Sequence, residues 1–173
     1  IKTRRLAWIN RQPGVDVKCT VDSLVNVQQI AAAGRDAGVN VRVLIEINSG
    51  MERAGVLPKD ALALAKEIAA LDGIEFAGLM TWEGHAMAYV DFEERTAVVT
   101  QSINQVLDAA EEIEGAGMPV EIVSVGGTGT YLISAGIEGV TEVQAGGGIW
   151  GDAMYIDLGA NVQPALELIT TVT

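Results

Sequence analysis

The feature that most constrains the fold is a regular alternation between short apolar runs and longer segments with helical periodicity. Apolar, β-branched runs predict strands at residues 15–23, 41–47, 74–81, 120–126 and 139–148. Apolar residues at helical spacing predict helices at residues 1–10, 24–38, 59–71 and 91–117. Such alternation predicts parallel strands joined by right-handed crossovers, and almost continuously apolar strands are covered on both faces. The fold class is therefore α/β, with either an open doubly wound sheet or part of a (β/α)8 barrel.

Two glycine-rich loops favour the barrel. The first is Gly126-Gly127-Thr128-Gly129-Thr130, and the second runs from Ala145 to Gly148, so they follow the last two predicted strands. In barrels that bind phosphate, the cradle comes from the loops after strands seven and eight. On that numbering the first predicted strand is strand four, and three further strands are expected before Ile1.

The same numbering divides the chain into two parts. We expect residues 1–159 to form strands four to eight of a TIM-type barrel. Residues 160–173 contain the alternating segment ALELITTVT, which follows Pro164 and has no helix after it. We expect this segment to begin a C-terminal β-domain.

The first glycine loop contains no lysine, so it is not the P-loop pattern. Glycines nevertheless let successive N–H groups point inward, and threonine hydroxyls add further donors for an anion. The alternative is a tight turn that needs positive φ angles. Because two such loops at neighbouring strand ends face one point, the sequence favours a phosphate site.

Three further side chains follow predicted strands. Arg53 could direct a permanent cation at a ligand, or it could be a surface residue paired with Glu46 or Glu52. Trp82 could form an aromatic wall for a planar ligand. His85 is the only histidine, which is too few for a metal site by itself, and the carboxylates near it are expected to be solvated.

Composition excludes several classes of partner. A net charge of −12 argues against binding to nucleic acid or anionic membranes, and the sequence contains no membrane-spanning apolar stretch. The single cysteine, Cys19, excludes an internal disulfide framework. We expect Cys19 to be buried in a strand and the protein to be cytoplasmic.

Four blocks of the sequence resemble, in this order, the D-threonine aldolase and D-serine dehydratase family of alanine racemase-type enzymes. The blocks are IEINSGMERAGV, FAGLMTWEGH, VSVGGTGTY and TEVQAGGGIWGDAMY. The resemblance covers about residues 15–173. It implies pyridoxal phosphate as the cofactor, a small D-amino acid as the substrate and a homodimer as the assembly. The implied reaction is retro-aldol cleavage of β-hydroxy D-amino acids, with dehydration or racemisation as alternatives.

The resemblance also implies roles for individual residues. Arg53 matches the arginine that approaches the pyridoxal hydroxyl, and Trp82 stands where an aromatic residue, commonly tyrosine, meets the ring nitrogen. An indole N–H only donates, so Trp82 could pair only with an unprotonated ring nitrogen. Asn48 stands where the family commonly has aspartate. Phosphate binding falls to the two glycine loops, at Gly127, Thr128, Gly129, Thr130, Gly147 and Gly148.

Other expected groups lie outside the chain. The family attaches its cofactor through a Schiff base to a lysine on the first barrel strand. None of the four lysines ends a predicted strand: they are Lys2, Lys18, Lys59 and Lys66. We therefore assign no catalytic residue and no metal ligand here, and expect any divalent metal in a C-terminal β-domain. A non-catalytic phosphate-binding relative and a cofactor-free enzyme for a phosphorylated substrate remain alternatives.

Overall fold

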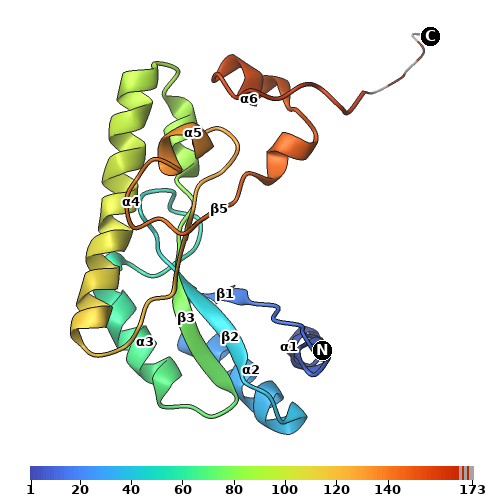
Figure 1. Ribbon diagram of the computed structural model, residues 1–173, viewed down its shortest axis with the longest axis vertical. Coiled ribbons are helices and arrows are strands. Elements are labelled where there is room, and N and C mark those ends of the chain that lie inside the picture. Colours follow the sequence, from blue (N-terminus) through green and yellow to red (C-terminus); the bar gives the residue numbers. More distant parts are fainter. Residues whose placement is uncertain (168, 170, 172–173) are drawn as a thin grey trace.

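The computed structural model describes residues 1–167, 169 and 171 and contains one parallel sheet (Figure 1). Its five strands lie side by side in sequence order, and every neighbouring pair is parallel. The strands are β1 (Cys19–Val21), β2 (Val41–Glu46), β3 (Ile74–Met80), β4 (Ile122–Val125) and β5 (Glu142–Val143). An unbroken sequential order is that of a barrel wall, because a doubly wound sheet reverses its order part-way. The predicted partial barrel is confirmed.

Three helices connect successive strands and pack on the sheet. They are α2 (Leu24–Ala37), α3 (Ala61–Ala69) and α4 (Phe92–Gly115). Ser23 caps α2 by accepting a hydrogen bond from the Asn26 N–H, and Gly38 ends it in the left-handed conformation. The N-terminal helix α1 (Lys2–Asn10) packs against α2 at one end of the molecule (Figure 1).

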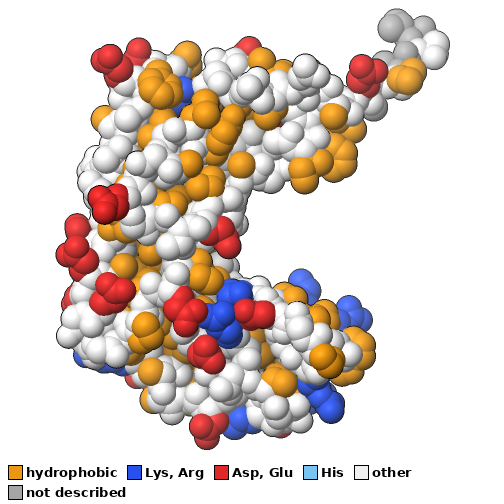
Figure 2. All heavy atoms as spheres, in the orientation of Figure 1, with side chains coloured by type: hydrophobic (Ala, Val, Ile, Leu, Met, Phe, Trp, Pro, Cys, Tyr) orange, Lys and Arg blue, Asp and Glu red, His pale blue; other side chains and the backbone are white. Residues whose placement is uncertain are grey.

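The core lies between the helices and one face of the sheet. Along β2, Val41, Val43 and Ile45 are fully buried, whereas Arg42 and Glu46 alternate with them and belong to the opposite face. Burying such a β-branched side chain contributes about 1.5–3 kcal/mol. The opposite face borders the concave side of the C-shaped molecule, between the α1 end and the α6 end (Figure 2).

The structure differs from the predicted elements at several places. The first strand is shorter than predicted because only Cys19–Val21 pairs with β2. β5 stops at Val143, and the glycines after it form the 3₁₀ turn η3 (Gly146–Ile149) instead of extending the strand. The segment 58–60 is likewise a 3₁₀ turn, η1 (Pro58–Asp60), before α3.

Three short elements were not predicted from the sequence. They are η2 (Gly84–Ala88), α5 (Tyr131–Ser134) and α6 (Ala153–Asp157). The predicted strand over 165–173 includes residues 168, 170, 172 and 173, which lie outside the described residues. Its described positions carry no strand, and the division of the chain at residue 159 stays a prediction.

A network of ion pairs joins the N-terminal ends of the strands. The Arg42 guanidinium lies 3.0 Å from Asp16, 3.2 Å from Glu75 and in contact with Glu121. Asp16 also pairs with Lys18 at 2.6 Å. The hydrogen bond from Lys18, followed by that from Arg42, lowers the pKa of Asp16.

Two expectations from composition can be compared with the structure. Cys19 lies in β1 as expected, but it is only half-buried against the core, so the expected full burial is wrong. The partial burial raises the pKa of its thiol. Among the described residues, no helix combines the length and the apolar character that a membrane crossing requires.

Candidate functional site

The carboxyl ends of the central strands surround a hollow of about 280 Å³. Five of the eight predicted cofactor-binding residues line it, namely Arg53, Trp82, Gly127, Thr128 and Gly147. They come from the loops after β2, β3, β4 and β5, which meet because parallel strands end at one edge of the sheet. The structure thus brings together residues that are up to 94 positions apart in the chain, from Arg53 to Gly147.

The first glycine loop is closed by its own hydrogen bonds. Gly126 has a φ of 84°, which starts the turn after β4. The Gly127 N–H donates to Thr130 Oγ1 at 3.1 Å, and the Thr130 N–H donates back to the Gly127 carbonyl at 3.1 Å. Thr130 is buried, and its hydroxyl stabilises the shape of the loop.

Three hydrogen-bond donors of this loop have no acceptor among the described residues. Thr128 is 3% exposed, and its Oγ1 is buried without a hydrogen-bond partner among the described residues. The backbone N–H groups of Thr128 and Gly129 also have no partner in this part of the chain. A buried polar atom without a partner is costly, and an anion that accepts from these donors would remove that cost.

Each glycine loop has a position that is packed too closely for a side chain. A Cβ on Gly127 would lie 2.7 Å from Trp82 Nε1. A Cβ on Gly147 would lie 2.7 Å from Tyr155 Cε2 and 2.9 Å from Thr128 Oγ1. The absence of a side chain at Gly147 keeps the space beside Thr128 open, and its absence at Gly127 makes room for the Trp82 indole.

Arg53 and Trp82 form one wall of the hollow. The Arg53 guanidinium lies 4.5 Å from the centroid of the Trp82 ring, within the range of a cation–π contact. Its Nη2 is also 3.6 Å from Glu46 Oε1, so Arg53 both reaches the hollow and makes the ion pair expected of a surface arginine. Of the described lining residues, Arg53 alone carries a charge, and that charge is positive.

The remaining three predicted residues, Gly129, Thr130 and Gly148, are not among the residues that line the hollow. A Cβ on Gly129 would overlap Met87 Sδ, so this glycine faces Met87. Its backbone N–H is nevertheless one of the three donors without a partner. Thr130 supports the loop from within, and Gly148 follows Gly147 in η3.

Sequence reasoning missed four residues that also line the hollow: Met80, Thr81, Gln144 and Tyr155. Gln144 is two positions beyond Glu142, so strand alternation could have placed both on one face. Its Nε2 donates to Ser124 Oγ at 2.8 Å. Tyr155 comes from the short helix α6, which has no periodic pattern that could have pointed to it.

The expectation of solvated carboxylates near His85 is wrong for Glu83. This residue is 0% exposed and accepts hydrogen bonds from the Gly126 N–H and the Ser134 hydroxyl. His85 itself lies 3.3 Å, through Nε2, from Ser102 Oγ, in a separate hollow. Within residues 1–167, 169 and 171, no group of three or more His, Cys, Asp or Glu side chains could hold a metal ion.

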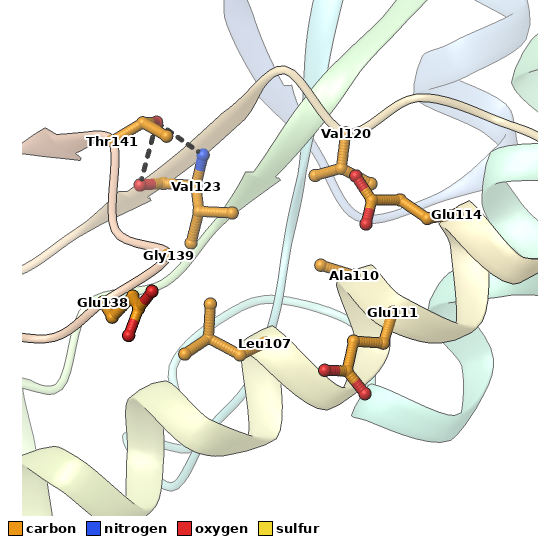
Figure 3. Close-up of a pocket in the computed structure, with 9 residues that line it drawn as sticks. All are labelled: Leu107, Ala110, Glu111, Glu114, Val120, Val123, Glu138, Gly139 and Thr141. Atoms are coloured by element: carbon orange, nitrogen blue, oxygen red, sulfur yellow. Dashed lines mark hydrogen bonds between the residues drawn. The ribbon is translucent and has the colours of Figure 1, made fainter.

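A further hollow of about 330 Å³ lies between α4 and the turn before β5 (Figure 3). Leu107, Val120 and Val123 contribute its apolar part. Three glutamates stand around them, Glu111, Glu114 and Glu138, and no described lining residue is cationic. This hollow would repel a phosphate group, in contrast to the one at the strand ends.

The sequence model of the family described as alanine racemase, N-terminal domain, matches residues 7–154. The chain belongs to this family. A solved structure shows the same fold: a D-threonine aldolase from Filomicrobium marinum superposes with a TM-score of 0.85 at 28% identity, covering 90% of this chain and 42% of that one.

Two curated relatives are similar in sequence. A 3-hydroxy-D-aspartate aldolase of Paracoccus denitrificans (strain Pd 1222) is 35% identical over 89% of this chain and 40% of its own length. A D-threo-3-hydroxyaspartate dehydratase of Delftia sp. (strain HT23) is 34% identical over 94% of this chain and 44% of its own. The chain thus spans about two fifths of the length of these relatives.

Proposed function

We propose that this chain forms the cofactor-binding wall of a pyridoxal-phosphate enzyme that acts on D-amino acids. The observation that carries the proposal is the set of three unpartnered donors at Thr128 and Gly129, beside a wall made by Arg53 and Trp82. The relatives named above act on β-hydroxy D-amino acids, according to their names. We propose retro-aldol cleavage of such a substrate first, and dehydration or racemisation as alternatives.

The residues present fit the phosphate of this cofactor. Phosphate oxygens accept hydrogen bonds, and the loop offers two N–H groups and a buried hydroxyl that have no other described partner. The glycines at 127 and 147 keep the neighbouring space free of side chains. Three donors are few for a dianion, so further donors from outside residues 1–173 are part of the proposal.

The ring would lie against the Arg53 and Trp82 wall. Arg53 places a permanent cation there, which suits the ionised hydroxyl of a pyridoxal ring. Trp82 offers an apolar face and an N–H donor. When bound, pyridoxal phosphate supplies an electron sink that stabilises negative charge at the α-carbon of an amino acid.

No lysine lines the hollow among the described residues. Lys18 pairs with Asp16 at the N-terminal ends of the strands, and Lys59 and Lys66 belong to η1 and α3. We therefore propose that the lysine that attaches the cofactor lies outside residues 1–173. A divalent metal, if the reaction uses one, is likewise proposed to bind elsewhere.

The proposal is tested by titrating pyridoxal phosphate into the chain and following visible absorbance, with inorganic phosphate as competitor. Thr128→Val keeps the shape of the side chain but removes its hydroxyl, and we expect it to weaken binding about tenfold. Thr96→Val is the matched control, because Thr96 is on α4 and its hydroxyl donates to the Phe92 carbonyl. If the titration curves of the unsubstituted chain, Thr128→Val and Thr96→Val are the same and none of them saturates, the proposal is contradicted.

A second candidate function is the binding of a phosphate ligand without turnover. It is favoured by the same lack of a lysine in the hollow among the described residues. This candidate predicts that simple phosphate esters bind as tightly as pyridoxal phosphate. A clear preference for the pyridoxal ring in the same competition assay would exclude it.

A further inference from the structure

The inference concerns Glu83, which follows Trp82 directly after β3. Its carboxylate is fully buried, and no described cation lies within ion-pair distance of it. A buried carboxylate without a counterion is costly unless hydrogen-bond donors surround it. Here Oε2 accepts from the Gly126 N–H at 3.1 Å, and Oε1 accepts from the Ser134 hydroxyl at 2.7 Å.

These two donors lie at opposite ends of the first glycine loop. Gly126 is where the chain leaves β4, and Ser134 is in α5, which follows the loop. The Ser134 hydroxyl is also 3.1 Å from the Thr130 carbonyl, so it has a second acceptor within the loop itself. One side chain from the end of β3 therefore ties down both the entry and the exit of the loop.

These two hydrogen bonds of Glu83, called the clamp below, fix the ends of the loop that carries the unpartnered donors. Gly126 and Ser134 are fixed, and the internal bond between Gly127 and Thr130 is closed. Within the described residues 126–130, only Thr128 and Gly129 therefore keep N–H groups without a partner. We propose that Glu83 is a positioning residue that holds this loop in its phosphate-binding shape before the ligand arrives. This inference rests on the proposed phosphate site and deepens it, since donors aligned in advance cost less to order on binding.

Two substitutions separate the hydrogen bonds of Glu83 from its charge. Glu83→Ala removes both acceptors, and we expect the affinity for inorganic phosphate to fall about tenfold or more. Glu83→Gln can keep both contacts. Its carbonyl can accept from the Gly126 N–H, and its amide can donate to Ser134 Oγ, whose proton then turns to the Thr130 carbonyl. We expect this variant to retain most of the affinity.

A matched pair of serine variants tests the exit end of the clamp. Ser134→Ala removes one donor to Glu83. Ser102→Ala is the control, because Ser102 is equally buried but donates to the Val98 carbonyl, away from the loop. We expect a similar drop in melting temperature for both variants, and a loss of phosphate affinity only for Ser134→Ala.

The decisive readout is the response of the Thr128 and Gly129 amide signals in NMR spectra of the full 173-residue chain titrated with inorganic phosphate. The clamp predicts that these chemical-shift changes saturate in the unsubstituted chain and in Glu83→Gln. In Ser134→Ala and Glu83→Ala, saturation should require a higher phosphate concentration. If Glu83→Ala does not fold, the Ser134→Ala and Ser102→Ala pair carries the same test.

The outcomes for the clamp and for the site are distinguishable. If the unsubstituted chain shows no saturable shifts, the phosphate site and the clamp are both overturned. If the unsubstituted chain binds phosphate and Ser134→Ala binds it with the same affinity, the clamp alone is overturned and the site stands. If Glu83→Gln loses as much phosphate affinity as Glu83→Ala, the proposal that Glu83 holds the loop through hydrogen bonds is also overturned.

Discussion

Gly147 is one of the residues at which the proposed site tolerates little change. A methyl group there would lie within 3 Å of both Tyr155 and Thr128 Oγ1. We expect Gly147→Ala to fill the phosphate space and to weaken inorganic phosphate binding, measured by calorimetry, at least tenfold. Gly146→Ala is the control, because a Cβ on Gly146 meets nothing within 4 Å. Equal affinities for the two variants would place the phosphate elsewhere.

Arg53 carries a second prediction at the scale of the residue. Lysine keeps the charge but lacks the planar group that lies over Trp82. We expect Arg53→Lys to reduce pyridoxal phosphate affinity about fivefold while leaving stability almost unchanged, since the side chain is 53% exposed. Arg35→Lys, in the last turn of α2, is the control in the same titration. Unchanged affinity in Arg53→Lys would leave only the ion pair with Glu46 as its role.

What the sequence could and could not predict is clearest at this scale. Thr128 and Gly147 were predictable because glycine-rich loops after neighbouring parallel strands must meet. The burial of Glu83 was not predictable, because its two donors lie 43 and 51 residues further along the chain. A carboxylate in a loop gives no local sign that distant groups will enclose it.

At the scale of elements, the strands joined by long helices were predicted well and the short elements were not. Runs such as 41–47 combine β-branched residues with flanking helical patterns, and both signals agree. The helices α5 and α6 have four and five residues, which is too short for a periodic pattern to appear. Their positions depend on tertiary contacts, such as the bond from Arg95 to the Leu158 carbonyl just after α6.

The ion-pair network at the N-terminal ends of the strands predicts a specific pH dependence. The folded pKa of Asp16 is below its ordinary value of 3.8, so its ionised form stabilises the folded state above that value. This contribution is lost as the pH falls through the lowered pKa. We expect Asp16→Asn to flatten the fall in the free energy of unfolding at acidic pH, measured by urea denaturation.

The control for this prediction is Asp36→Asn. Asp36 is exposed on α2 and makes no ion pair among the described residues. Its variant should follow the pH profile of the unsubstituted chain. If Asp16→Asn also follows the pH profile of the unsubstituted chain, the ion pairs with Lys18 and Arg42 contribute nothing measurable to stability, as is common for exposed ion pairs.

At the scale of the whole molecule, the sheet is one wall of a barrel with β1 and β5 at its edges. Apolar side chains gather toward the α6 end (Figure 2), where Ile149 and Trp150 are 72% and 57% exposed. Exposed apolar surface of this kind favours association. We expect the chain to form dimers or larger species, seen by light scattering after size-exclusion chromatography, and Trp150→Arg to shift it toward monomer.

Trp8→Arg on α1 is the matched control for that experiment, since Trp8 is also exposed and the same substitution is then made at the opposite end of the molecule (Figure 1). Association that is equal in all three proteins would show that the surface around Trp150 is not the contact. A monomer at every concentration of the unsubstituted chain would contradict the expected homodimer for this chain.

The positions of the four lysines lead to the last prediction. None of them lines the hollow at the carboxyl ends of the strands, so no described amine is in place to bond to the cofactor aldehyde. We expect the 173-residue chain to bind pyridoxal phosphate reversibly, to lose it on dialysis and to leave D-threonine uncleaved. Borohydride treatment followed by intact-protein mass spectrometry measures covalent attachment, with free lysine in solution as the positive control for reduction. A stoichiometric adduct on a single lysine, together with cleavage of D-threonine, would contradict the prediction. It would also show that the chain supplies its own catalytic amine, because only a lysine brought to the Arg53 and Trp82 wall could combine both results.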